Sequence, residues 1–377
     1  MSSVLPTLYA SAASAASALS LPLRRPMLAL WLLCAAVGSA QADKIDDLVL
    51  AEMQRQQIPG LSLAVVKNGK VIKEKGYGWA NVEHKIAATP QTIFQSGSIG
   101  KQFTAALVMR LVQDGNIVLD APISTYLAGT PKAWEKVTVR HLLTHTSGLA
   151  SSDAKVDLRK DYTEAQLLQV AAELPPSFAP GEKWEYSDVG YQVLGFMCSQ
   201  VGGKFYGDQL AERIFQPLGM KTAIINERNI VPHRAAGYDL EKGALKNQRW
   251  VSPSLNTTAD GSLYLTAHDL ALWDLALYGN QPLSSTLKQQ SWTPVTLNDG
   301  KTHPYGFGWQ LSESNGHRSM AHDGEWQGFT TYFGRFPDDR LSVVVLTNLA
   351  GAKPQKVAEQ VAAHYLGRAG GVGRKGD

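Results

Sequence analysis

The hydrophobic pattern divides the chain, with strand-like segments near both ends and helix-like segments between them. An amphipathic helix is predicted over about 43–57, and the apolar run 61–66 is typical of a strand. Asn68-Gly69 is a strong signal for a two-residue hairpin, so residues 70–76 should return as a second strand. These segments predict one part of a sheet near the N-terminal end.

The middle of the chain has helical periodicity with Pro/Gly punctuation, and strand patterns return only late. Helices are predicted over 139–145, 164–174, 187–201, 205–215 and 267–278, with Thr138, Thr163 and Thr266 as caps. Strands are predicted over 305–310, 330–336 and 341–346, followed by a helix over 356–365. The simplest α/β fold is one sheet built from both ends and covered by helices, with an inserted helical lobe and a ligand cleft between them.

The first 42 residues have the pattern of a secretion leader. Arg24-Arg25-Pro26 precedes the apolar run 27–38, and Ala40-Gln41-Ala42 is a small-residue cleavage site. We therefore expect a secreted or periplasmic protein cleaved after Ala42; Leu33 argues against lipidation of Cys34. The expected domain is 43–367, with the sheet part about 43–95 and 300–367, the lobe about 96–299, and a flexible tail at 368–377.

Composition and charge narrow the classes of partner. The 36 basic and 33 acidic residues give a net charge of +3, which offers no electrostatic reason to bind nucleic acid or an anionic membrane. No apolar run after residue 42 is long enough to cross a bilayer. Cys198 is the only cysteine after the leader, so no intramolecular disulfide can form, and its apolar surroundings predict a buried, inert thiol.

The segment Ser98-Ile-Gly-Lys101 is an S-x-x-K motif and the first candidate catalytic motif. The helix predicted over 99–113 is apolar on most faces, so Ser98 and Lys101 should share one face at the start of a buried helix. We expect Lys101 Nζ to reach Ser98 Oγ, and we expect burial to lower the pKa of Lys101 so that it acts as a base. The alternative is a helix cap and a surface charge, which we prefer for the copies at Ser152–Lys155 and Ser285–Lys288.

Two further motifs could complete the site. Tyr186-Ser187-Asp188 begins an apolar helix after a Pro-Gly turn, where a phenol could carry a proton to a leaving group. His322-Asp323-Gly324 precedes a predicted strand, and its glycine would let substrate approach the backbone. Each motif alone has an ordinary alternative, a half-buried tyrosine or a strand-end histidine.

The order of these three motifs is that of serine β-lactamases and penicillin-binding proteins. The chain resembles the class C β-lactamase-like family of serine hydrolases, which includes D,D-peptidases, D-aminopeptidases, class C β-lactamases and esterases. The resemblance extends over about 45–365 through the segments Val139–Leu149, Phe178–Gly181, Ala259–Leu263, Tyr305–Trp309 and Val345–Asn348.

The resemblance implies a mostly antiparallel sheet, flanked by helices, with a helical lobe. It also implies that Ser98 is the nucleophile, Lys101 its base and Tyr186 the second proton carrier. The backbone amides of Ser98 and Glu325 would form the oxyanion hole.

The chain departs from class C β-lactamases at two positions of the motifs. Asp188 replaces Asn, and near Lys101 a carboxylate would favour the ammonium form. His322 replaces Lys, and its charge is expected to change between about pH 5 and 8, so a fixed cation for a substrate carboxylate is lost. Both changes favour an esterase-like or peptidase-like enzyme over a dedicated β-lactamase.

Three other interpretations are weaker. His141 and His145 have the spacing of two zinc ligands on one helical face, but no third ligand is evident, and no G-x-S-x-G elbow surrounds Ser98. A catalytically silent relative that binds cell-wall peptides or a protein would be expected to lack Ser98, Lys101 or Tyr186. We therefore predict a cofactor-free, metal-free hydrolase of an ester, amide or β-lactam in a small molecule or peptide. Residues 150–162 and 226–256 should line its substrate pocket, while the sequence does not define the oligomeric state.

Overall fold

The computed structural model describes residues 43–150, 155–221, 223, 225, 229–314 and 316–366. The predicted leader, its cleavage site and the tail at 368–377 lie outside the described residues, as does Ser152. No helix in the described part of the chain is both long and apolar enough to cross a membrane.

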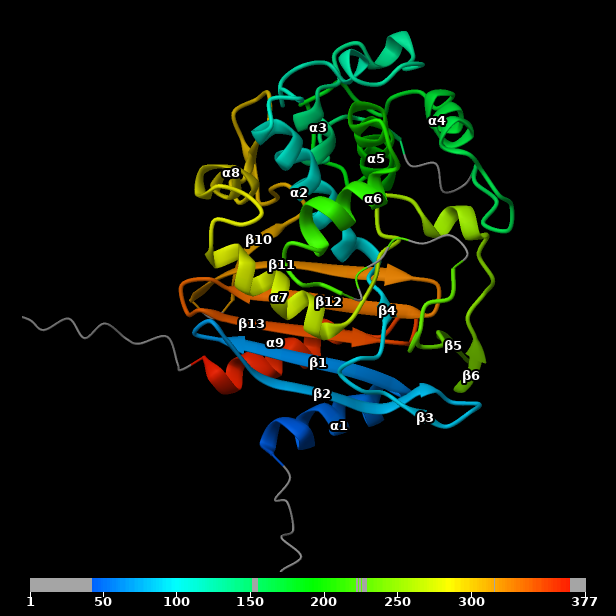
Figure 1. The fold of residues 1–377 in the computed structure, drawn as a ribbon, viewed down its shortest axis with the longest axis vertical. Coiled ribbons are helices and arrows are strands. Elements are labelled where there is room, and N and C mark those ends of the chain that lie inside the picture. Colours follow the sequence, from blue (N-terminus) through cyan, green and yellow to red (C-terminus); the bar gives the residue numbers. More distant parts are fainter. Residues whose placement is uncertain are drawn as a thin grey trace, which may run out of the picture. The chain divides into compact units, whose positions relative to one another are not determined.

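One seven-stranded antiparallel sheet organises the described fold (Figure 1), with the strand order β10-β11-β12-β13-β1-β2-β3. Strand β1 lies between a strand from its own end of the chain and a strand from the other, with Leu61 opposite Thr347 of β13. The predicted sheet from both chain ends is thus confirmed. Its strands are β1 (Gly60–Lys67), β2 (Lys70–Asn81), β3 (Ile86–Ala87), β10 (Gln310–Ser314), β11 (His317–Trp326), β12 (Phe329–Phe336) and β13 (Leu341–Thr347).

The hairpin between β1 and β2 forms where the sequence predicts it. Asn68 and Gly69 have φ angles of 51° and 75°, and a type I′ turn needs positive φ at both central positions. The alternation of side chains along β1 then gives the sheet two apolar faces. Leu61 and Leu63 belong to the core under the terminal helices α1 (Lys44–Gln56) and α9 (Pro354–Tyr365), whereas Ala64 belongs to the core under the lobe.

The lobe is helical, and the three predicted threonine caps are in place, while Ser187, expected within the helix 187–201, is the cap of α5 (Asp188–Gly202). Side chains of Thr138, Thr163, Ser187 and Thr266 each accept a hydrogen bond from the first turn of the helix that follows. The helices are α2 (Gly100–Gln113), α3 (Val139–Leu143), α4 (Glu164–Ala172), α5 (Asp188–Gly202), α6 (Tyr206–Leu210), α7 (Ala267–Tyr278) and α8 (Ser285–Ser291). Short strand pairs join them: β4 (Phe94–Gln95) with β7 (Tyr264–Leu265), β5 (Tyr238–Glu241) with β6 (Ala244–Asn247), and β8 (Val295–Thr296) with β9 (Thr302–His303).

Three predicted elements are wrong in detail. The strand expected at 305–310 is a turn, because Gly308 has a φ of 75° and Gly306 N donates to Trp309 O. Helix α3 ends at Leu143 rather than at His145, which has a φ of 59°. The helix expected at 205–215 is α6 followed by one π-helical turn from Ala211 to Phe215.

One large core joins the sheet to the lobe. It contains Phe333 and Val344 from the sheet together with Phe103 of α2 and Leu194 of α5, all fully buried. Cys198 is also fully buried in it, and burial raises the pKa of its thiol to about 12, which agrees with the predicted inert residue. This core fixes the position of α2, whose N-terminal end carries the candidate nucleophile.

Candidate active site

Ser98 lies at the junction of a short 3₁₀ turn (η1, Gly97–Ile99) and helix α2. The turn is held from both sides, since Ser96 N donates to Leu263 O at 2.8 Å and Thr331 Oγ1 donates to Ser96 O at 2.6 Å. The helix behind Ser98 is buried on nearly every side, as its apolar sequence predicts, whereas Ser98 itself is partly exposed.

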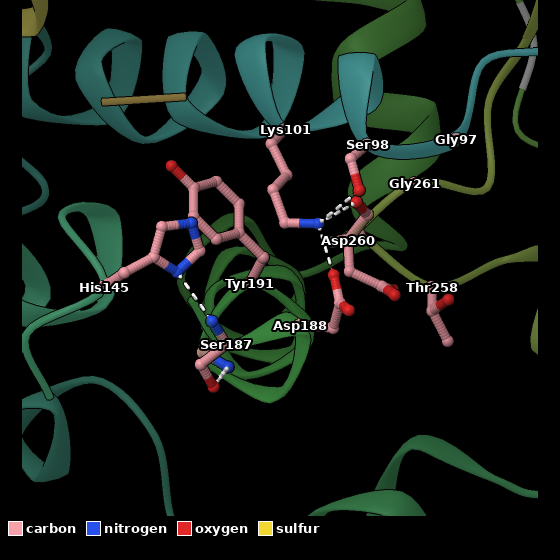
Figure 2. Close-up of polar contacts among 12 residues, drawn as sticks. Gly97, Ser98, Lys101, His145, Ser187, Asp188, Tyr191, Thr258, Asp260 and Gly261 are labelled. Carbon is pink, nitrogen blue, oxygen red and sulfur yellow. Dashed lines mark hydrogen bonds and ion pairs between the residues drawn. The ribbon is translucent and has the colours of Figure 1, made fainter. Parts of the chain in front are cut away.

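Lys101 places its ammonium among three oxygen atoms (Figure 2). Nζ lies 3.1 Å from Ser98 Oγ, 2.5 Å from Asp188 Oδ1 and 2.6 Å from the backbone oxygen of Asp260. The Lys101 side chain is fully buried, so these three partners replace its water. The predicted contact between Lys101 and Ser98 is thus present, and Lys101 also forms a charged hydrogen bond with Asp188.

The prediction that Lys101 has a lowered pKa is wrong, whereas the expectation that Asp188 favours the ammonium form is confirmed. Burial alone would lower this pKa, but the neighbouring acidic groups of Tyr186, Asp188 and Asp260 outweigh burial and raise it. Lys101 is therefore an ammonium at neutral pH in the protein without substrate.

Tyr186 lies beside Lys101, with Nζ 4.8 Å from the centre of its ring. Its hydroxyl is buried and has no hydrogen-bond partner within the described residues. Burial raises the pKa of Tyr186, against the opposing effect of the Lys101 ammonium, so the phenol keeps its proton. A neutral O–H group that lies beside the candidate nucleophile and has no hydrogen-bond partner is suited to donate a proton to a bound molecule.

Asp260 is a site residue that sequence reasoning missed. It follows the turn at 253–258, and besides its backbone bond to Lys101 it contributes a buried carboxyl whose Oδ1 lacks a partner in the described residues. Burial, followed by the neighbouring Asp188, raises the pKa of Asp260. The segment Ala259–Leu263 is part of the family resemblance, but a single acidic residue in it carries no signal until α2 and α5 bring Lys101 and Asp188 to it.

The strand β11 lies directly against the Ser98 turn, and two glycines permit this. A Cβ added at Gly324 would lie 2.1 Å from Ser96 O and 3.0 Å from Ser98 N, and one added at Gly97 would lie 2.4 Å from Glu325 N. The backbones around the Ser98 and Glu325 amides therefore meet at close range. Since side chains alternate along a strand, the exposed Glu325 side chain points to the opposite face from Gly324, and only its backbone faces the site.

His322 lies within β11 and is only 1% exposed, so the sequence placed it wrongly at a strand end. Its Nε2 bonds to the Tyr305 hydroxyl at 2.9 Å and its Nδ1 to the backbone oxygen of Asp323 at 2.6 Å. Burial lowers the pKa of His322 to about 4. The prediction that its charge changes between pH 5 and 8 is therefore wrong, and no bond joins it to Ser98 or Tyr186 in the described structure.

His145 completes this buried chain of rings and fixes its proton order. Ser187 N donates to His145 Nδ1 at 3.0 Å, so neutral His145 carries its proton on Nε2 and donates it to the Tyr305 oxygen at 3.1 Å. The Tyr305 hydroxyl then donates to His322 Nε2, and His322 Nδ1–H donates to Asp323 O. The His145 ring also packs 4.3 Å from the Tyr186 ring, centre to centre, so the chain supports the site from behind.

The alternative sites predicted from sequence are explained by structural contacts. His141 and His145 do not share a helical face, because α3 ends between them, and His141 Nδ1 accepts from Thr138 N in the helix cap. In the second S-x-x-K copy, Lys288 Nζ donates to the backbone oxygens of Leu277 and Gly279 at the end of α7 and does not contact Ser285 within the described residues.

Known proteins resemble this chain over most of its length. A family model described as Beta-lactamase matches residues 45–366. Penicillin-binding protein 4* of Bacillus subtilis (strain 168) is 30% identical over 317 residues, which cover 78% of this chain and 69% of that protein. Protein flp of Staphylococcus aureus (strain MW2) is 28% identical over 331 residues, which cover 84% of this chain and 65% of that protein. The chain thus spans about two thirds of these relatives.

Solved structures share the fold. The octameric penicillin-binding protein homologue from Pyrococcus abyssi superposes with a TM-score of 0.76 at 29% identity, over 86% of this chain and 77% of that chain. The D-amino acid amidase from Ochrobactrum anthropi SV3, complexed with L-phenylalanine amide, gives a TM-score of 0.73 at 25% identity, over 85% of this chain and 96% of that chain. With the sequence match covering nearly all the described residues, the chain belongs to the Beta-lactamase family of penicillin-binding-protein-like serine hydrolases.

Proposed function

We propose that this protein is an exported serine hydrolase that cleaves an ester, amide or β-lactam bond through an acyl-enzyme on Ser98. The observation that carries the proposal is the Lys101 ammonium, which contacts Ser98 Oγ and Asp188 Oδ1 at once. A buried cation bonded to both a hydroxyl and a carboxylate can pass a proton between them. The similarity to a D-amino acid amidase supports amides among the possible substrates.

The acylation step requires the Ser98 proton to leave as the serine attacks. Because Lys101 is already an ammonium, it gives one proton to the Asp188 carboxylate and takes the Ser98 proton. Lys101 thus remains charged and Asp188 becomes neutral. The freed Oγ bonds to the substrate carbonyl carbon, and the resulting oxyanion accepts hydrogen bonds from the backbone amides of Ser98 and Glu325.

The leaving group needs a proton when its bond to the carbonyl carbon breaks. Tyr186 supplies it from its unpartnered hydroxyl, and the phenolate that remains is stabilised by the Lys101 ammonium nearby. Lys101 gives a proton to the phenolate and takes the stored proton back from Asp188, so the net change is one proton lost by Ser98 and one gained by the leaving group. Water then attacks the acyl-enzyme, and the same groups return a proton to Ser98.

The test follows the covalent intermediate. Wild type, Ser98→Ala and the control Ser285→Ala are incubated with a penicillin and, separately, with p-nitrophenyl acetate, while intact mass and product release are recorded. We expect an acyl adduct or turnover in wild type and Ser285→Ala only, because Ser285 is an exposed serine in the other described S-x-x-K motif. The same spectra read the exported protein's first residue, expected to be Asp43. Equal reaction of Ser98→Ala would refute the nucleophile, and a wild type inert to both compounds would favour a silent binding protein.

A further inference from the structure

A small cavity adjoins the Asp188 and Asp260 side chains. It has a volume of about 230 Å³, and its apolar walls come from the loop before α4, from α4 itself, from the turn at 253–258 and from β11. Its apolar lining residues are Val156, Leu158, Leu167, Leu255 and Trp326. Three of these, Val156, Leu158 and Leu255, lie in the segments 150–162 and 226–256, where the sequence placed the substrate pocket. A cavity of this size and lining suits one apolar side chain of moderate size.

The polar part of the cavity is acidic. Asp188 and Asp260 both line it, and none of its described lining residues is Lys, Arg or His. Asp260 is only 9% exposed, and its Oδ1 has no partner among the described residues. Its side chain extends toward Thr258, another lining residue (Figure 2). A buried carboxyl oxygen without a donor is costly, and a ligand that brings a donor would remove the cost.

The acidic end lies next to the nucleophile. Asp188 Oδ1 and Ser98 Oγ are both bonded to Lys101 Nζ, so they lie within about 6 Å of each other. A substituent on the carbon next to the scissile carbonyl reaches this distance when the carbonyl is placed on Ser98. Lys101, the one cation seen near Ser98 in the described site, is already paired with Asp188, so a substrate carboxylate would meet two acidic groups and no free cation.

We infer that this cavity binds the acyl part of the substrate, and that it selects an acyl group with an apolar side chain and a protonated amine beside the scissile carbonyl. This inference rests on the proposed function. The ammonium would donate to the Asp260 and Asp188 carboxyls while the side chain occupies the apolar walls. Burial and Asp188 raise the pKa of Asp260, and a bound cation would oppose both effects. Acyl groups with a carboxylate at the same position would be rejected.

Three racemic or achiral esters that differ at one group provide the test. They are leucine methyl ester, 4-methylpentanoic acid methyl ester, which lacks the amine, and isobutylmalonic acid monomethyl ester, which carries a carboxylate instead. For wild type we expect kcat/KM to fall at least about tenfold without the amine, since a buried charged hydrogen bond is lost, and further with the carboxylate. Equal rates for the first two esters would overturn the inference.

Two variants test which residue causes the preference for the amine ester. Asp260→Asn keeps the shape but loses the charge, and we expect it to reduce the ratio of kcat/KM for the amine ester over the amine-free ester at least about tenfold. Asp208→Asn makes the same charge change at an exposed position outside this cavity and should leave the ratio unchanged. If the ratio were unchanged in Asp260→Asn, Asp260 would not be the residue that selects the amine, and the inference would be overturned.

A binding measurement separates this inference from the proposed chemistry. Calorimetry on Ser98→Ala with leucine amide and 4-methylpentanamide needs no turnover. If Ser98→Ala binds leucine amide preferentially while wild type hydrolyses none of the esters, the cavity's assignment is kept and the hydrolase is refuted. Equal or absent binding of leucine amide would overturn the inference even if Ser98-dependent hydrolysis of other esters is found.

Discussion

At the scale of single residues, the site depends on which group holds one proton. Asp188 replaces the asparagine of class C β-lactamases, and its carboxylate is 2.5 Å from Lys101 Nζ. An asparagine could bond to the ammonium through its oxygen, but it could not accept a proton from it. In the proposed mechanism, the aspartate therefore changes Lys101 from a base that must itself be neutral into a charged relay between Ser98 and Asp188.

Substitution of Asp188 by Asn tests the relay through pH dependence. The Asp188 charge contributes to the raised pKa of Lys101, so its removal lowers that pKa, and neutral Lys101 must then act as the base. We expect kcat/KM at pH 7 to fall about 10²-fold and to rise about tenfold per pH unit between pH 7 and 9, as the neutral fraction grows. Wild type and Glu185→Gln, an exposed neighbour with the same charge change, should not show this slope. A flat profile for Asp188→Asn at the wild-type rate would refute the relay.

Substitutions of two tyrosines near Lys101 distinguish an effect on catalysis from an effect on stability. Tyr186 has a buried hydroxyl without a partner in the described residues, whereas the Tyr191 hydroxyl donates to Leu143 O at 2.9 Å. We expect Tyr186→Phe to lower kcat about 10²-fold or more for amides, and less for p-nitrophenyl esters, without loss of stability. Tyr191→Phe should instead cost about 1 kcal/mol of unfolding free energy and little kcat. Steady-state kinetics and urea denaturation measure both; the reverse outcome would remove Tyr186 from the chemistry.

The sequence predicted the packing around Ser98 better than it predicted the protonation state of the neighbouring groups. The apolar faces of the helix after Ser98 predicted its burial, and the i, i+3 spacing predicted the contact between Lys101 and Ser98. The pKa of Lys101 was predicted in the wrong direction, because it depends on Asp260 and Tyr186, which are distant in sequence and whose approach to Lys101 has no local pattern. The same holds for the partnerless carboxyl of Asp260.

At the scale of elements, buried rings connect the end of α3, the turn before β10 and the middle of β11. Local signals were sufficient for capped helices and for the Asn68-Gly69 hairpin. They failed for the turn at 305–310, where aromatic residues and glycines alternate as residues in a strand do. They also failed for β11, because its polar residues His322 and Asp323 interrupt the apolar pattern expected of a strand inside the sheet. Only tertiary contacts explain why His322 is buried and neutral: it accepts from Tyr305 and donates to a backbone oxygen.

This ring chain predicts a loss of stability in acid. The pKa of His322 is about 4 in the folded protein and about 6.5 in the unfolded chain, so the unfolded state takes up the proton first as pH falls. Stability from neutral His322 is complete above about pH 6.5 and is lost progressively toward pH 4, on the order of 3 kcal/mol in all. We expect His322→Gln to be less stable than wild type at pH 7, with the difference narrowing by pH 5. Denaturant titrations at both pH values measure it, and a constant difference would contradict the burial of a neutral imidazole.

At the scale of the described molecule, the candidate site joins the sheet to the lobe. Ser98 lies in the 3₁₀ turn before α2, Lys101 lies in the first turn of α2, and Asp188 starts α5. The Gly324–Glu325 backbone belongs to β11. The large core contains buried side chains of all these elements, so the geometry around Lys101 depends on both parts being folded together. The sequence predicted the two parts from the positions of strand and helix patterns, but it gave no measure of how strongly they are coupled.

Two leucines in this shared core test the coupling. Leu194 of α5 and Leu346 of β13 are both fully buried in it, and either Leu→Ala change should cost about 2–5 kcal/mol of unfolding free energy. Because the core is continuous, we expect each change to destabilise both parts equally. Hydrogen exchange of peptides from α5 and from β13 is followed across a denaturant series. Within each protein the two peptides should begin to exchange at the same denaturant concentration, and in both variants that concentration should be lower than in wild type. The partly exposed Leu240 provides a control whose change to Ala should shift neither. If Leu194→Ala released α5 while β13 stayed protected, the lobe would be a separate folding unit, and the site would be assembled by docking of two preformed parts.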